Sequence, residues 1–203
     1  MNYYLLVYKG NTSITSGEDL GSEYNLGIGC PVCGTGAKLM SNLYINEMPK
    51  PNIHFFRTMD GDFIVSEELY LKLNTIGLCN FNKVSLKQGI LLSYYHLKSE
   101  QTLNKMMSKS KGIIKEGGCS LCQRDGFFGT KNEDSQFCYT HTDFDENINI
   151  YETWECFGLS NMVKEGNKVV RYARPRLIVS EEFKNIFEQM NIVNTSFNQV
   201  RIE

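Results

Sequence analysis

Two cysteine pairs with the same short spacing are the residues of this chain best suited to chemistry. Cys30 and Cys33 stand in the stretch GIGCPVCGTG, and Cys119 and Cys122 stand in GGCSLCQRDG. A C-x-x-C turn among small residues can aim two thiolates at one ion, because each sulfur bound to zinc lies about 2.3 Å from it. One turn supplies two of four tetrahedral ligands. The two turns together therefore predict a closed zinc site made by all four cysteines.

Two other interpretations of these cysteines remain open. Cys138 and His141 form a C-x-x-H that begins after a gap of fifteen residues from Cys122. A local site of Cys119, Cys122, Cys138 and His141 has a spacing that is also typical of zinc. The other interpretation is that no metal binds, and that the thiols are reduced core residues or form an adventitious disulfide.

The remaining sequence indicates a cytoplasmic protein without an active site. The chain has seven cysteines, an odd number, and its first ten residues do not resemble a signal peptide, which favours a reducing compartment. Cys79 and Cys156 lie in apolar sequence and are predicted to be core residues. No G-x-S-x-G, H-E-x-x-H or phosphate-loop motif is present. Four thiolates leave zinc no open position, so we expect a structural metal and no enzyme.

An internal repeat suggests the elements that position the cysteines. Residues 64–68 and 178–182 both read IVSEE. In each copy a serine, Ser66 or Ser180, precedes two glutamates, which is typical of a helix N-terminus. An apolar helical stripe follows in each copy, formed by Leu69, Leu73 and Ile76 in the first and by Phe183, Phe187 and Met190 in the second. The repeat predicts an α+β fold: two related strand-helix-strand halves with short sheets, linked by the zinc-ribbon-like site.

The repeat also divides the chain. We expect residues 1–98 to form an N-terminal half that starts with a strand at MNYYLLVY, and residues 119–203 to form a C-terminal half. Residues 90–98, ILLSYYHLK, are expected to form a further strand. Residues 99–118 are rich in lysine and serine and are expected to be a solvated linker. The two halves are also compatible with one compact domain.

An acidic segment, residues 132–155, is the part of the chain most similar to a docking surface. It holds seven acidic residues, no lysine or arginine, and five aromatic residues. Acidic groups steer a basic partner toward a surface, and tyrosine and tryptophan anchor it. The alternative is a solvated acidic loop whose aromatic residues are buried. The residues predicted to contact a partner are Asp143, Asp145, Glu146, Tyr151, Glu152 and Trp154.

These features together resemble the double-CxxCG motif family of bacterial immunity proteins, the Sit-type group encoded beside exchanged toxins. The shared elements are the N-terminal strand, the knuckle CPVCG, the second knuckle CSLCQRDG, an aromatic stretch with Trp154 and Phe157, and the closing RLIVSEEFKNIFEQMNIVNTSFNQV. Gln123 departs from the family, which usually has glycine there to ease a strained turn. The resemblance implies a cytoplasmic antidote that neutralises a cognate toxin by stoichiometric occlusion. It also implies that the four motif cysteines bind zinc, and it assigns no catalytic residue.

The alternative function is a zinc-ribbon module that binds nucleic acid or a transcription complex. Such a module carries lysine, arginine and aromatic residues around its knuckles. Here only Lys38 stands near the first knuckle, and Lys115 and Arg124 stand near the second. The formal net charge is -2, which gives no general attraction to nucleic acid. We therefore expect no nucleic-acid partner, and no apolar run is long enough for a membrane span.

Overall fold

The structure, a computed structural model, describes residues 2–78, 81–130, 135–162, 169–171 and 173–203. Strands make up 38% of it and helices 12%. The fold class predicted from the sequence, α+β with short sheets, is therefore wrong, because the protein is mostly β and its sheets curl into half-barrels. The repeat identified the two helices, and strands were expected at MNYYLLVY and within residues 90–98, but most of the other strands before and between the two copies were not predicted. No helix in the described part of the chain is long and apolar enough to cross a membrane.

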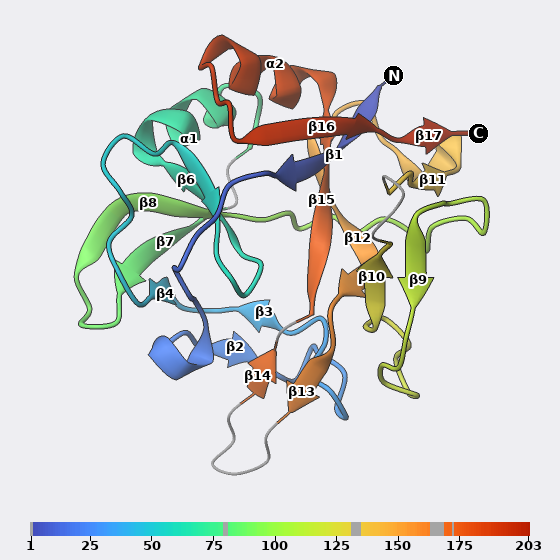
Figure 1. Ribbon diagram of the computed structural model, residues 1–203, viewed down its shortest axis with the longest axis horizontal. Helices are drawn as coiled ribbons and strands as arrows, with labels where there is room; N and C mark the ends of the chain where they lie inside the picture. Colours follow the sequence, from blue (N-terminus) through green and yellow to red (C-terminus); the bar gives the residue numbers. More distant parts are fainter. Residues whose placement is uncertain (1, 79–80, 131–134, 163–168, 172) are drawn as a thin grey trace.

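Two main sheets contain most of the strands (Figure 1). The four-stranded sheet has the order β12 (Ile150–Phe157), β15 (Arg174–Ser180), β1 (Tyr3–Tyr8), β16 (Thr195–Gln199). The five-stranded sheet has the order β4 (Leu43–Ile45), β7 (Phe81–Leu86), β8 (Leu91–Leu97), β6 (Phe63–Ser66), β5 (Phe55–Arg57). All neighbouring strands are antiparallel except β4 and β7.

Short pairs of strands complete the described structure. They are β2 (Tyr24–Asn25) with β3 (Lys38–Leu39), β9 (Ile113–Lys115) with β10 (Phe127–Gly129), β11 (Cys138–Tyr139) with β17 (Arg201–Ile202), and β13 (Ser160–Met162) with β14 (Val169–Arg171). Single 3₁₀ turns lie at Glu18–Leu20 and His141–Asp143.

The two copies of the repeat have the same arrangement. In the first, α1 (Glu67–Asn74) connects β6 to β7, and these strands flank β8. In the second, α2 (Glu181–Gln189) connects β15 to β16, and these strands flank β1. Ser66 Oγ accepts a hydrogen bond from the Leu69 N–H at 3.3 Å, and Ser180 Oγ accepts one from the Phe183 N–H at 3.2 Å. Both predicted N-caps are confirmed, as is the strand expected within residues 90–98.

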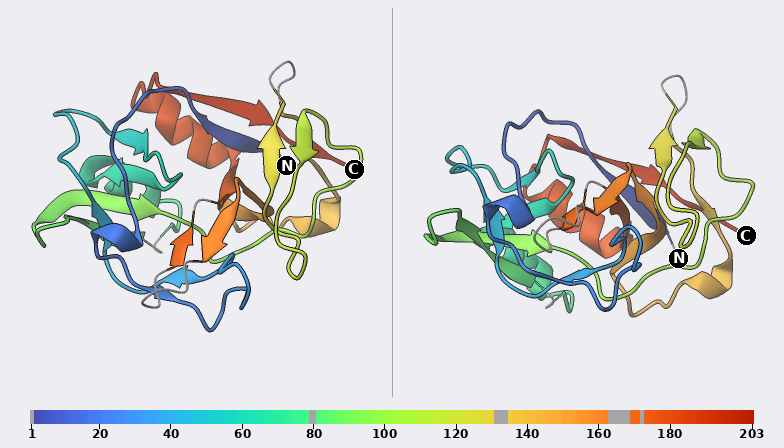
Figure 2. Two further views of the ribbon diagram at one scale, coloured as in Figure 1. Left: turned by 60° about the horizontal axis from the view of Figure 1, so that its bottom comes forward. Right: turned by 90° about the horizontal axis from the view of Figure 1, so that it is seen from below.

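The first strand of the chain interlocks the two halves. β1 lies between β15 and β16, in the sheet built from the C-terminal repeat, and Figure 2 shows it running alongside β16. Its sequence YYLLVY is apolar on both faces, which suits a central strand. Tyr4 and Leu6 face one core, while Tyr3 and Leu5 face another, as the period of a strand requires. The N-terminal half thus contributes a central strand to the sheet of the C-terminal half.

The two helices share a single core. Leu69 and Leu73 of α1 pack in the same buried cluster as Phe183 and Phe187 of α2, together with residues from both main sheets. The segment 99–118 also packs against the protein: Ser99 and Leu103 are buried, and β9 lies within it. The Leu103 N–H donates to the Glu152 carbonyl at 2.9 Å, which fixes this segment beside β12.

Candidate metal centre and the neighbouring cavity

The two C-x-x-C turns meet in space. The four sulfur atoms of Cys30, Cys33, Cys119 and Cys122 all lie within 4.8 Å of one another. Cys30 Sγ is 3.8 Å from Cys119 Sγ, and Cys33 Sγ is 3.6 Å from Cys122 Sγ. A tetrahedron of sulfurs about 2.3 Å from a central ion has edges of about 3.8 Å, whereas a disulfide joins its sulfurs at about 2.05 Å. The predicted convergence is confirmed, and the cluster is compatible with a metal site.

The backbones of the two knuckles repeat one another. The Gly34 N–H donates to the Cys30 carbonyl at 2.8 Å, and the Gln123 N–H donates to the Cys119 carbonyl at 3.0 Å. Gly34 has φ 73° and Gln123 has φ 56°. The turn therefore needs a left-handed residue directly after its second cysteine, which favours glycine. Gln123 adopts this conformation at a cost of about 1–2 kcal/mol.

Hydrogen bonds around the sulfurs hold the knuckles in place. Asp125 is buried, and its Oδ1 accepts from the Cys119 N–H at 2.8 Å while its Oδ2 accepts from the Ser160 N–H at 3.0 Å. On the first knuckle, the Cys33 thiol donates to Thr35 Oγ1 at 3.0 Å, and the Thr35 hydroxyl donates to Ser160 Oγ at 2.8 Å. Ser160 thus connects both knuckles.

Sequence reasoning missed Asp125, Thr35 and Ser160. Asp125 and Thr35 stand close to cysteines, and an aspartate beside a tight turn is a signal for side-chain bonding to backbone N–H groups. Ser160 carries no such signal, because both of its partners are distant in the sequence.

The protein environment shifts the pKa values of the cysteine thiols in different directions. Burial opposes ionisation of Cys30, but hydrogen bonds from the backbone N–H groups of Cys33 and Val32 outweigh it and lower the Cys30 pKa to about 7. Burial raises the pKa of Cys33 to about 12 and also raises the pKa of Cys122. A metal ion that binds all four as thiolates must therefore displace protons.

The alternative local metal site, which would add Cys138 and His141 to the second knuckle, is not formed in the structure. Cys138 is buried, with its thiol donating to Met107 Sδ at 3.8 Å, while His141 is exposed. Among the described residues, the four motif cysteines are the one group of three or more potential ligands within metal-binding distance. Cys156 is buried, as predicted for a core residue, and Cys79 lies outside the described residues.

The residues predicted to bind a partner are spread over three environments. Asp145 and Glu146 are exposed. Tyr151 is only 5% exposed and packs in a core cluster. Asp143 closes a capping box with Thr140, accepting from the Thr140 N–H at 2.8 Å. The surface available at this segment is therefore smaller than the sequence suggested.

The other two predicted contact residues lie on β12. Trp154 is partly buried, with Lys105 and Arg124 over its ring at 5.5 and 5.8 Å. Glu152 lines a cavity beside the metal centre. Glu133 and Asp134, at the start of the acidic segment, lie outside the described residues.

The cavity has a volume of about 240 Å³ and lies between the two main sheets. Part of its lining comes from the neighbourhood of the knuckles, namely Gly36, Arg124 and Cys156. Another part is formed by charged residues of both sheets and their connections. These are Lys38, Asp62, His96, Lys98, Glu100, Glu152 and Arg174.

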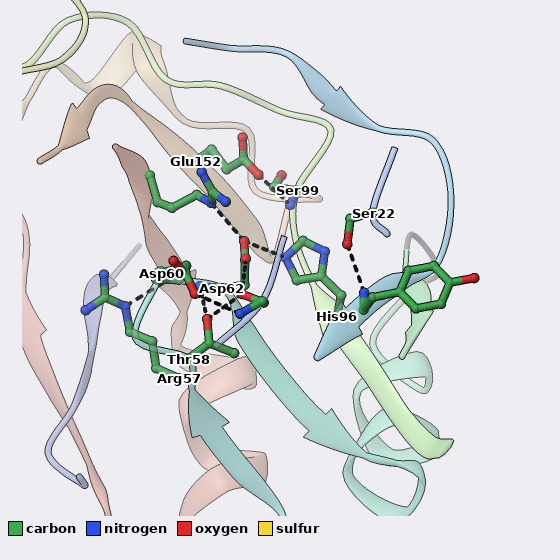
Figure 3. Close-up of polar contacts among 12 residues, drawn as sticks. Ser22, Arg57, Thr58, Asp60, Asp62, His96, Ser99 and Glu152 are labelled. Carbon is green, nitrogen blue, oxygen red and sulfur yellow. Dashed lines mark hydrogen bonds and ion pairs between the residues drawn. The ribbon is translucent and has the colours of Figure 1, made fainter. Parts of the chain in front are cut away.

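A buried ion pair in this lining connects the sheets, and Figure 3 shows one of its members, Asp62, beside His96. Asp62 precedes β6 in one sheet, and Arg174 begins β15 in the other. Arg174 Nε donates to Asp62 Oδ1 at 3.0 Å, His96 Nε2 is 3.6 Å from the same oxygen, and the Ser16 hydroxyl donates to Asp62 Oδ2 at 2.7 Å. Burial alone would raise the pKa of Asp62, but the charge of Arg174 outweighs it and holds this pKa well below its usual range.

Two comparisons with known proteins found no relative of this chain. No protein-family model matches the chain, and a search of curated proteins finds no similar sequence.

Proposed function

We propose that this protein is a cytoplasmic immunity protein that binds a cognate toxin and occludes its active or substrate-binding surface. The observation that carries the proposal is the convergence of the two C-x-x-C knuckles on one four-sulfur cluster. That convergence is what the resemblance to double-CxxCG immunity proteins requires of this chain. The resemblance also covers the first strand and the closing strand-helix-strand, which form one sheet here.

The metal that best fits the cluster is zinc. Four thiolates at the spacing of a tetrahedron form a site typical of structural zinc, and soft thiolate donors disfavour hard cations such as magnesium and calcium. Asp125, which accepts a hydrogen bond from the Cys119 N–H, and Thr35, whose hydroxyl oxygen lies 3.0 Å from the Cys33 sulfur, supply the outer support that such sites need. All four tetrahedral positions are filled by protein, so the ion would stabilise the fold and would not act on a substrate.

The proposed role of the metal is to make the knuckle surface rigid. Val32 and Leu121 stand between the cysteines of their knuckles and are 57% and 61% exposed. The exposed acids Asp145 and Glu146 offer a second contact region for a basic face of the toxin. Stoichiometric binding needs a preformed surface and no reaction, which agrees with the absence of a catalytic motif from the sequence.

Co-expression with the toxin encoded beside this gene tests the proposal. Cells that produce both proteins should grow, and cells that produce the toxin alone should die. Cys33→Ser should lose protection, whereas Cys138→Ala, at a buried cysteine outside the cluster, should retain it. Equal death with and without the wild-type protein would show that it gives no immunity to that toxin.

Metal analysis separates the zinc proposal from the toxin proposal. The purified wild-type protein should hold one zinc ion per chain, and Cys33→Ser should hold much less. Iron in place of zinc would contradict the metal assignment while leaving the immunity assay unaffected.

Charge reversal locates the proposed toxin-binding surface. The double variant Asp145→Lys with Glu146→Lys should weaken toxin binding more than Glu188→Lys, which lies on the exposed side of α2.

A further inference from the structure

The cavity between the sheets holds more positive charge than its acidic residues neutralise. Asp62 is paired with Arg174. Glu100 is shared by two lysines, with Lys38 Nζ at 2.7 Å and Lys98 Nζ at 3.2 Å from its carboxylate oxygens. These pairs leave one lysine charge in excess, and Arg124 adds another. The cavity therefore favours an anion over a cation.

Glu152 is the one carboxylate of the cavity that the described ion pairs do not use. Its Oε1 accepts from the Ser99 N–H at 3.4 Å, a long hydrogen bond. Burial raises the pKa of Glu152 to about 7, although the Ser99 N–H and Lys38 act in the opposite direction. Near neutral pH, a substantial share of the molecules carries a protonated Glu152. In that form the side chain can donate a hydrogen bond to an incoming oxygen.

The rest of the lining is apolar. Ala37, Leu39, Phe63, Leu97 and Leu177 are all buried residues that contribute to the cavity wall. A ligand that places a charged group among the lysines can therefore bury an apolar body against these side chains. Apolar walls with a few polar groups are typical of small-molecule sites.

We propose that the cavity binds a small carboxylic acid with an apolar body. Its carboxylate lies near Lys38, Lys98 and Arg124 and accepts a hydrogen bond from Glu152, while its body contacts Leu39, Leu97 and Leu177. The apolar wall favours a carboxylic acid with an apolar body over inorganic phosphate, which has none. This site is separate from the proposed toxin surface and does not depend on it.

Binding should couple to the protonation of Glu152. An ionised Glu152 repels the carboxylate, and a protonated one holds it. The groups that act on its charge most directly are Lys38, Lys98 and Glu100. The other titratable groups that line the cavity are Tyr24, Asp62, His96, Cys156 and Arg174. His96 lies 3.6 Å from Asp62 within this lining, so the test must separate its contribution from that of Glu152.

Calorimetry on the full-length, metal-loaded protein provides the test, with acetate, butyrate and benzoate as probes. Benzoate should bind at least tenfold more tightly than the neutral benzamide. It should also bind more tightly than acetate, which lacks the apolar body. Above pH 7 the affinity for benzoate should fall by about tenfold per pH unit, since binding then requires uptake of a proton.

Three variants make the test specific. Glu152→Gln keeps a donor but cannot ionise, so benzoate affinity should become nearly independent of pH. Glu146→Gln, at an exposed glutamate outside the cavity, should keep the wild-type pH dependence. Lys98→Gln should weaken benzoate binding several-fold without changing the affinity for benzamide. Unchanged metal content and thermal unfolding in each variant would confirm that the fold is intact.

Several results would overturn the proposal. One is that none of the three acids saturates the protein below about 10 mM, which is weaker than the millimolar affinities of small fragments. Another is that benzamide binds as well as benzoate. A wild-type pH dependence in Glu152→Gln would assign the coupling to His96 instead of Glu152. Tighter binding of inorganic phosphate than of any of the acids would reassign the ligand class.

Discussion

The buried ion pair between Asp62 and Arg174 should contribute strongly to the stability of the protein. The two side chains are only 5% and 8% exposed. Asp62 directly precedes β6 of one main sheet, and Arg174 begins β15 of the other. The test is the substitution of each partner by a neutral residue of similar shape, Asp62→Asn and Arg174→Met, alone and together. Either single change leaves the other charge buried without its partner.

The expected magnitude follows from the geometry. At 3.0 Å and an effective dielectric constant of about 20, the attraction between the charges is about 5–6 kcal/mol. Much of this offsets the cost of removing two ions from water, so the net value of the pair is small. Removing one partner is different, because the desolvation cost of the remaining ion persists. Each single variant should therefore lose about 3–5 kcal/mol of the free energy of unfolding.

The double variant gives the sharper result. Asp62→Asn with Arg174→Met removes both charges, so its loss should fall short of the sum of the single losses by about 2–3 kcal/mol. Urea unfolding of the metal-loaded proteins, followed by circular dichroism, measures all four states of this cycle. Glu188→Gln is the matched control, because its partner Lys184 lies 3.7 Å away on an exposed helix face. That change should cost less than about 1 kcal/mol.

Two outcomes would refute this reasoning. If Asp62→Asn costs no more than Glu188→Gln, the pair does not hold the sheets together. If the losses at Asp62 and Arg174 simply add, the two residues act independently, and the 3.0 Å contact has no energetic counterpart.

Three further predictions concern pH, the metal and the knuckle backbone. The pKa of Asp62 is depressed in the folded protein, so the contribution of its charge to stability is complete above about pH 4 and is lost as the pH falls further. The difference in unfolding free energy between wild type and Asp62→Asn should therefore shrink on acidification. An unchanged difference at pH 2 would contradict this prediction. Metal removal by a chelator should lower the unfolding temperature of the wild-type protein and speed hydrogen exchange at residues 29–37 and 117–126. Cys33→Ser should have the lower unfolding temperature before any chelator is added. The chelator should then change its unfolding temperature little. Gln123→Gly should stabilise the protein by about 0.5–1 kcal/mol, and Gly34→Gln should destabilise it by about 1–2 kcal/mol. The reason is that both positions need a left-handed backbone, which glycine adopts without strain. Equal effects of the same sign in denaturant unfolding would show that the turn does not impose this requirement.

The four-cysteine cluster was predictable because its signal is local. Each knuckle is a turn of a few residues, and cysteines, glycines and spacing describe it fully. The departure at Gln123 was also visible in the sequence, and the structure gives it a physical meaning in its φ of 56°. What the sequence left open was the pairing of the knuckles, since Cys138 and His141 offered a rival.

The fold class was not predictable in the same way, because the sequence of β12 did not look like a strand with buried side chains. Its acids Glu152 and Glu155 suggested a surface, yet Glu155 is completely buried and Glu152 faces a cavity. Charge in a sequence usually indicates exposure. Here the Met106 N–H donates to Glu155 Oε1 at 2.9 Å, a contact made by a distant segment. A buried acid can be identified only when its partners are known.

The position of β1 also bears on what the proposed metal would be needed for. If the two halves were separate, the knuckles would have to hold them together. Instead β1 lies between β15 and β16, and Leu69 of α1 and Phe183 of α2 share one core. We therefore expect the halves to remain associated without the ion. We propose instead that the metal fixes the two loops that carry Val32 and Leu121. Its loss should then disorder that surface before it unfolds the sheets. Toxin binding would then fail at a metal occupancy at which the circular dichroism spectrum of the sheets is still unchanged.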